Sequence, residues 1–166
     1  MKRAAFSLGL ALFIVAAYAV PVSTLRLTAV HAQWSNPQSD IPPYHDAPPA
    51  PGQVLPPILH GGQLSGPFFR KPWQVAVYKE AAQIPDVLYQ LPCLCGCERT
   101  LGHTSLHSCF EGTHGAVCGT CAAEEAYAYE MTKRGWTVRQ IRAGIEHHAY
   151  ESIDLSKLGL SKPGQS

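Results

Sequence analysis

The sequence has little net charge and no dense cluster of basic side chains. Over 166 residues, thirteen lysines and arginines balance twelve aspartates and glutamates, for a formal net charge of +1. Three of the basic residues fall within the first 32 positions, so the rest of the chain carries ten basic against twelve acidic residues. Nucleic-acid binding needs a basic patch that neutralises phosphates. We therefore expect no nucleic-acid partner.

Familiar catalytic and structural patterns are also missing. The chain contains no G-x-S-x-G, no phosphate-binding loop, no H-E-x-x-H and no dinucleotide fingerprint. No segment alternates between apolar and polar residues as a half-buried strand does, and no internal repeat is visible. We assign no catalytic residue, leave enzymatic activity open, and expect an all-α fold.

The N-terminus resembles a targeting segment. A positive start, Met1–Arg3, precedes an uncharged apolar stretch from Ala4 to Val22. Both Val30-His31-Ala32 and Ala17-Tyr18-Ala19 are compatible with a cleavage site. An uncleaved membrane anchor is the alternative, because the stretch is close to the roughly 20 residues that span a bilayer. In either case residues 1–32 predict an exported protein, periplasmic or otherwise extracytoplasmic, with membrane contact only through residues 4–22.

Proline separates this segment from the part that should fold. Ten of the fourteen prolines fall between residues 33 and 72, and proline fixes φ and removes a hydrogen-bond donor. We expect residues 33–67 to form a semi-rigid linker, residues 68–160 to form one Cys/His-rich helical domain, and residues 161–166 to be a tail.

Periodicity and end signals predict a small bundle of three or four helices with a Cys-rich loop. The expected helices cover residues 73–83, a short stretch from Pro85, 119–134 and 137–148. Gly135 suits the position after a helix end, and Thr137 with Gln140 forms a capping box. In the 119–134 helix, Glu124 and Glu125 are expected to favour the macrodipole at its start.

Six cysteines and three histidines lie within 29 residues, in the pattern C-x-C-x-C-x5-H-x3-H-x-C-x4-H-x3-C-x2-C. The cysteines are Cys93, Cys95, Cys97, Cys109, Cys118 and Cys121, and the histidines are His103, His107 and His114. This density of soft ligands predicts a functional site at these residues, without identifying what it binds.

The spacing of the cysteines suits several chemistries. Cys118 and Cys121 meet the start of a predicted helix, where one turn can bring two sulfurs to one metal and where a thiolate is stabilised. In an extended strand, Cys93 and Cys95 would lie about 6.6 Å apart, too far for one metal. Gly96 lets the loop curl so that neighbouring sulfurs converge, which favours a nest of thiolates over structural disulfides.

The histidines are harder to assign as metal ligands or as ordinary surface residues. His103 and His107 are four residues apart, so on a helix they would share one face at metal-ligand spacing. His114 lies between two cysteines in a glycine-containing turn. The adjacent His147 and His148 are expected to be exposed at the end of the last helix.

Three interpretations of the cysteine and histidine cluster remain open. An even number of cysteines in an exported chain is typical of disulfides, here with fifteen possible pairings. Crowded thiolates with nearby imidazoles favour a metal, Cu(I) first and Zn second, since an Fe–S cluster is hard to assemble outside the cytoplasm. Low-pKa cysteines beside further cysteines also suit thiol–disulfide exchange.

The motif Pro92-Cys93-Leu94-Cys95-Gly96-Cys97 resembles that of the bacterial PCYCGC (or CYCXC) family of small exported proteins. The similarity extends over roughly residues 75–150, through the pairs and spacings Ile84-Pro85, Leu91-Pro92, Gly102-His103, Cys109-Phe110, His114-Gly115 and Cys118-x-x-Cys121. Leu94 replaces the usual tyrosine, and no lipobox cysteine is present, so lipid anchoring is not carried over. The resemblance implies no settled function. Selenocysteine in the motif of some similar proteins implies redox chemistry without excluding a metal.

The first hypothesis is an exported metal-binding protein that holds Cu(I) or Zn for storage, delivery or sensing. Its expected ligands are Cys93, Cys95, Cys97, Cys109, Cys118, Cys121, His103 and His114. Its expected partners are the metal ion and a redox or metal-delivery protein. An extracytoplasmic thiol oxidoreductase and a disulfide-stapled interaction module are the alternatives.

Overall fold

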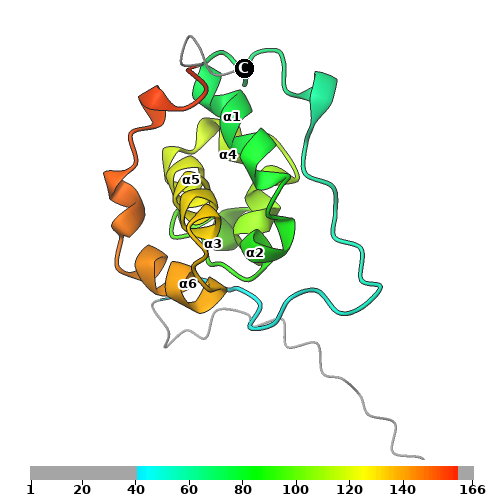
Figure 1. The fold of residues 1–166 in the computed structure, drawn as a ribbon. Coiled ribbons are helices and arrows are strands. Elements are labelled where there is room, and N and C mark those ends of the chain that lie inside the picture. Colours follow the sequence, from blue (N-terminus) through cyan, green and yellow to red (C-terminus); the bar gives the residue numbers. More distant parts are fainter. Residues whose placement is uncertain (1–40, 161–166) are drawn as a thin grey trace, which may run out of the picture. The chain divides into compact units, whose positions relative to one another are not determined.

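The computed structural model describes residues 41–160, which form helices and turns and no strand. The predicted signal or anchor segment, the first part of the predicted linker and the tail at 161–166 lie outside the described residues. The helices are α1 (Pro72–Ala81), α2 (Pro85–Tyr89), α3 (Cys97–Thr100), α4 (His114–Val117), α5 (Gly119–Lys133) and α6 (Val138–Glu146). The all-α prediction is confirmed, with α1, α5 and α6 as the substantial helices (Figure 1).

The central helix of the domain is α5. It packs against α1 on one side and α6 on another (Figure 1). Its residues from Cys121 to Ala128 are all buried, and several of them are alanines, whose small side chains let neighbouring helices approach closely. A helix that is enclosed on all sides belongs to the core, so the residues of α5 define the centre of this molecule.

Local signals explain where the helices begin and end. Pro85 opens α2 at its first position, as expected. Gly135 has a φ of 81° after the end of α5, and the Trp136 N–H donates to the carbonyl of Met131 at 3.0 Å, which completes a Schellman motif. Thr137 and Gln140 cap α6 reciprocally, at 3.3 Å and 2.9 Å, so the predicted capping box is confirmed.

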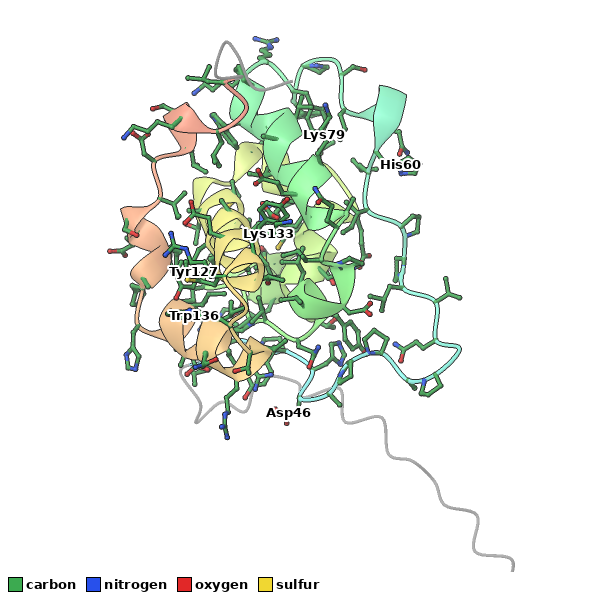
Figure 2. All side chains as sticks on the ribbon, in the orientation of Figure 1. Asp46, His60, Lys79, Tyr127, Lys133 and Trp136 are labelled. Atoms are coloured by element: carbon green, nitrogen blue, oxygen red, sulfur yellow. The ribbon has the colours of Figure 1, made fainter. Side chains whose placement is uncertain are left out.

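Aromatic and aliphatic side chains fill the space between α1, α2, α5 and the 3₁₀ turn Leu106–Phe110. Tyr78 on α1 and Phe110 meet edge to face with ring centroids 5.0 Å apart, and both are fully buried. The Tyr78 hydroxyl donates to the carbonyl of Gly112 at 2.6 Å, which satisfies its polar end inside the core. Trp136, in the turn between α5 and α6, is 44% exposed (Figure 2).

The described part of the proline-rich segment contacts the helical domain. Ile58 is buried in the core, and the Leu59 N–H donates to the carbonyl of Phe110 at 3.1 Å. Arg142 on α6 reaches the Asp46 carboxylate at 3.3 Å and stacks on Tyr44; Figure 2 labels Asp46 below α6. Residues 41–60 therefore lie along the domain, while the boundary between linker and domain stays a prediction.

Among residues 41–160, no helix combines the length and the apolar character needed to cross a membrane.

Candidate metal centre

Four short stretches of chain deliver the predicted ligands to one place. Cys93 and Cys95 lie in the loop between α2 and α3, and Cys97 begins α3. His103 follows α3 in a loop, and Cys109 lies in the 3₁₀ turn. The remaining three are placed by the start of two helices: His114 is the first residue of α4, Cys118 is the N-cap of α5, and Cys121 lies in its first turn.

The turn at Gly96 brings the C-x-C-x-C sulfurs together. Gly96 has a φ of 80°, a left-handed conformation that glycine adopts without strain. It lies between Cys95 and Cys97. In the preceding turn the Sγ atoms of Cys93 and Cys95 lie 3.3 Å apart, about half the separation expected for an extended chain. The predicted curl of this loop is confirmed.

The six sulfurs form a connected cluster without any disulfide. All six cysteines are free. Cys93 and Cys121 are 3.4 Å apart, Cys95 and Cys121 3.5 Å, and Cys97 and Cys109 3.6 Å, each between Sγ atoms. A disulfide requires about 2.05 Å. The structure thus describes six neighbouring thiols and not three covalent staples.

Two histidines complete the cluster. His114 Nε2 lies 3.6 Å from the Cys95 sulfur, and His103 Nδ1 lies 3.3 Å from the Cys109 sulfur. The two imidazoles also meet each other edge to face, with centroids 5.3 Å apart. All eight predicted ligands are therefore brought into one neighbourhood.

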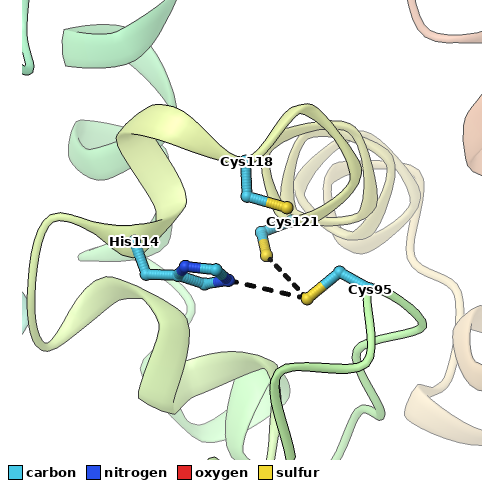
Figure 3. A group of neighbouring side chains, drawn as sticks. All are labelled: Cys95, His114, Cys118 and Cys121. Carbon is cyan, nitrogen blue, oxygen red and sulfur yellow. Dashed lines mark hydrogen bonds between the residues drawn. The ribbon is translucent and has the colours of Figure 1, made fainter. Parts of the chain in front are cut away.

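Within this neighbourhood, four overlapping sets of side chains could hold a metal ion, because the ligand atoms of each set lie within 4.8 Å of one another. Figure 3 shows one of them, in which the side chains of α4, the start of α5 and the C-x-C-x-C loop converge. The sets are Cys95, His114, Cys118 and Cys121; Cys97, His103, Cys109 and His114; Cys93, Cys95 and Cys97; and Cys93, Cys109 and Cys121.

The third histidine of the motif lies outside the cluster. His107 is buried, and its Nδ1 lies 3.0 Å from the Glu111 carboxylate. His103 and His107 do not share a helical face, because His103 is in a loop and the 3₁₀ turn starts only at Leu106. His147 and His148 are exposed, as predicted.

The cluster is shielded from solvent unevenly. Cys93, Cys97, Cys109 and Cys121 are buried, whereas Cys95 and Cys118 are partly exposed. Cys95 also lines a surface cavity of about 420 Å³, together with Glu98, Arg99 and Glu146. Ligands and solvent can therefore reach the cluster at Cys95 without opening the core.

Charge is shared unequally among the metal-free thiols. Hydrogen bonds from neighbouring thiols, that of Cys109 first, lower the pKa of Cys95 and of Cys97. Hydrogen bonds within the same network, again with Cys109 first, raise the pKa of Cys93 and of Cys121. Since the thiolate is the form that binds metal and attacks disulfides, Cys95 is the cysteine that is both accessible and readily ionised.

The sequence did not indicate that two carboxylates of α5 would be buried, one of them, Glu124, next to the cluster. Glu124 and Glu125 were expected to serve the macrodipole of α5, yet both are fully buried. Glu124 Oε1 accepts a hydrogen bond from the Leu94 N–H at 2.7 Å, and burial raises the pKa of Glu124 to about 8. This contact fixes the backbone between Cys93 and Cys95.

A sequence signal exists for Glu124. Cys121, Glu124, Ala128 and Met131 follow one another at three- and four-residue spacing, which places them on one face of a helix. Glu124 interrupts an otherwise small or apolar stripe, so its position predicts burial beside Cys121.

These features define a small all-helical protein whose core holds a cluster of free thiols and imidazoles. Residues 67–154 match the family described as "protein of unknown function with PCYCGC motif", and the chain belongs to this family. The motif reads Pro-Cys-Leu-Cys-Gly-Cys here, with Leu94 at the third position. No curated protein and no solved structure matches the chain.

Proposed function

We propose that this protein binds a thiophilic metal ion, Cu(I) in first place and Zn(II) in second, for storage, delivery or sensing. The observation that carries the proposal is the convergence of six free thiols and two imidazoles on ligand sets whose atoms lie within 4.8 Å of one another. Thiolates with imidazoles are the donor set that these two ions prefer.

The spacing of the sulfurs supports this proposal. A tetrahedral ion with metal–sulfur bonds of about 2.3 Å separates its sulfur ligands by about 3.8 Å. The neighbouring Sγ atoms are 3.3–3.6 Å apart, so an ion needs only a small outward movement of the side chains.

Burial supports it as well. Four of the cysteines are buried, and a buried thiolate without a counter-charge is costly. A bound cation offsets that charge and releases the thiol protons. The surplus of sulfur over the four donors of a zinc site favours Cu(I), while the two histidines suit either ion.

The direct test is metal titration of the reduced, full-length protein without oxygen, with Cu(I) and Zn(II) in separate experiments. We expect tight, stoichiometric binding that protects the thiols from alkylation. The double variant Cys95→Ser/Cys97→Ser should lose most of this binding, because it removes a ligand from each of the two four-ligand sets. His147→Asn, an exposed histidine outside the cluster, is the matched control. Unchanged metal stoichiometry in the double variant would refute the proposal.

Thiol–disulfide exchange is the second candidate, favoured by the accessible, readily ionised Cys95 next to Cys93 and Cys121. The Cys95 thiolate would attack an acceptor disulfide and form a mixed disulfide with one of its sulfurs. A neighbouring thiolate would then attack the Cys95 sulfur and release the acceptor. In total, two thiols of this protein lose two protons and two electrons, and the acceptor becomes a dithiol. Reversible cycling with a dithiol reductant, in a protein that takes up no metal, would favour this function over metal binding.

We further propose that the protein acts outside the cytoplasm. The proposal rests on the charged start and the apolar stretch of residues 1–32. Cell fractionation with N-terminal sequencing tests it: export with cleavage after residue 32, or retention in the membrane with an intact N-terminus, would agree, and an intact protein in the cytoplasm would not.

A further inference from the structure

We infer that the cluster holds two metal ions at once, each bound by three cysteines and one histidine. The inference rests on the proposed metal-binding function and adds the number of ions and the ligands of each. Its basis is the way in which the eight donor atoms divide.

The two four-ligand sets barely overlap. One set joins the start of α5 to the C-x-C-x-C loop and consists of Cys95, His114, Cys118 and Cys121. The other joins α3 to the 3₁₀ turn and consists of Cys97, His103, Cys109 and His114. Only His114 belongs to both, so two ions compete for one side chain and not for the sulfurs.

His114 can coordinate only one of these two ions. A neutral imidazole has one nitrogen with a free lone pair, because the other nitrogen carries a proton. His114 Nε2 lies 3.6 Å from the Cys95 sulfur, which places this nitrogen with the set at the start of α5. The set around Cys109 then keeps Cys97, His103 and Cys109 and lacks a fourth ligand.

Cys93 supplies that fourth ligand. It belongs to neither four-ligand set, yet its sulfur lies within 4.8 Å of the sulfurs of Cys97 and Cys109. With Cys93 included, the second ion is held by Cys93, Cys97, His103 and Cys109. All eight donors are then used, four for each ion, which is the number of protein ligands that closed structural zinc sites have.

Cys93 also connects the two sites. Its sulfur lies 3.3 Å from that of Cys95 and 3.4 Å from that of Cys121, both ligands of the first ion. A thiolate in this position can bridge two ions, so loading of one site positions a ligand of the other. Two cations also offset more of the charge of six clustered thiolates, four of them buried, than one cation can.

The test is native mass spectrometry of the reduced, full-length protein after loading with Zn(II) and, separately, with Cu(I). We expect two tightly held ions in the wild-type protein and in the control His147→Asn. Cys118→Ser removes a ligand of the first ion alone, and His103→Asn removes a ligand of the second alone. Each should retain one ion, and the double variant should retain none.

X-ray absorption at the zinc edge provides a measurement that needs no variant. The loaded wild-type protein should show an average of three sulfur ligands and one nitrogen ligand per zinc. One ion per wild-type chain, or loss of all metal from both single variants while their helical circular dichroism is unchanged, would overturn the two-ion assignment alone. No tight metal in the wild-type protein would instead overturn the proposed function.

Discussion

At the scale of single residues, the burial of Glu124 and Glu125 on α5 is a costly feature of this protein. Both are fully buried, and neither carboxylate oxygen of Glu125 has a hydrogen-bond partner among residues 41–160. Burial, together with repulsion by Glu80, raises the pKa of Glu125 well above its ordinary value. Glu125 is therefore protonated at pH values at which an exposed glutamate is charged.

Replacement of this carboxyl should stabilise the protein in a pH-dependent way. A raised pKa means that the stability associated with Glu125 is complete below its ordinary pKa of 4.5 and is lost as pH rises through the raised value. We expect Glu125→Gln to increase the free energy of unfolding by about 1–3 kcal/mol above neutral pH, and by less at pH 4.5.

Chemical denaturation of the reduced, metal-free protein across this pH range measures the difference. Glu130→Gln on the same helix is the control, because its exposed pair with Arg134 is worth only about 0.3–0.5 kcal/mol. A Glu125→Gln variant that is equally destabilised at every pH would contradict the expectation.

The close approach of the eight candidate ligands could be expected at this scale, but their surroundings could not. Soft ligands at close spacing are visible in the sequence, and all eight meet in the structure. His107 has the same residue type and spacing, yet pairs with Glu111. The path of the chain between α3 and Leu106 places His103, and not His107, next to the sulfurs. That path depends on tertiary packing, which the sequence pattern does not show.

At the scale of elements, helix ends place the site. The cluster is built where α3, α4 and α5 begin, so the local signals that start these helices also position Cys97, His114 and Cys118. Ends with strong local signals were predictable, as for α2 and α6. The one-turn helices α3 and α4 were not, because four residues give no periodicity and isolated short helices are unstable without packing.

The cap of α6 offers a test at this scale. Thr137 accepts a hydrogen bond from the Gln140 N–H at the start of the helix, and loss of an N-cap typically costs about 1 kcal/mol. We expect Thr137→Ala to lower the free energy of unfolding by about that amount, with Thr104→Ala, an exposed threonine outside the helices, as control. Equal midpoints for the two variants in urea would argue against the cap.

At the scale of the whole molecule, the candidate ligands connect stretches of chain from residue 93 to residue 121. Metal binding is therefore expected to stabilise the fold, because a ligand that binds only the native state shifts the unfolding equilibrium. At free metal 1,000 times above Kd, one site contributes about 4 kcal/mol.

Thermal unfolding with and without metal checks this linkage. We expect a higher midpoint for the Zn(II)-loaded protein, and a strong chelator should return the midpoint to that of the metal-free form. The same addition of metal to Cys95→Ser/Cys97→Ser should have little effect. A rise of equal size in both proteins would point to binding outside the cluster.

The packing of the proline-rich residues 41–60 against the helical domain was the feature least predictable from the sequence. The proline-rich composition of residues 33–67 predicts an extended spacer, whereas residues 41–60 contact α2, α6 and the 3₁₀ turn through His45, Asp46 and Leu59. Proline content describes local backbone stiffness. It carries no information about whether an extended segment finds a surface to pack against.

The short distances between the sulfurs have a chemical consequence for the lifetime of the reduced state. Neighbouring Sγ atoms 3.3–3.6 Å apart need to approach by only about 1.5 Å to reach the bond length of a disulfide. Oxidation of any such pair removes two donors from the cluster. Under aerobic conditions oxidant and metal therefore compete for the same sulfur electrons, and an ion that arrives early acts as a protecting group that preserves the site for later exchange.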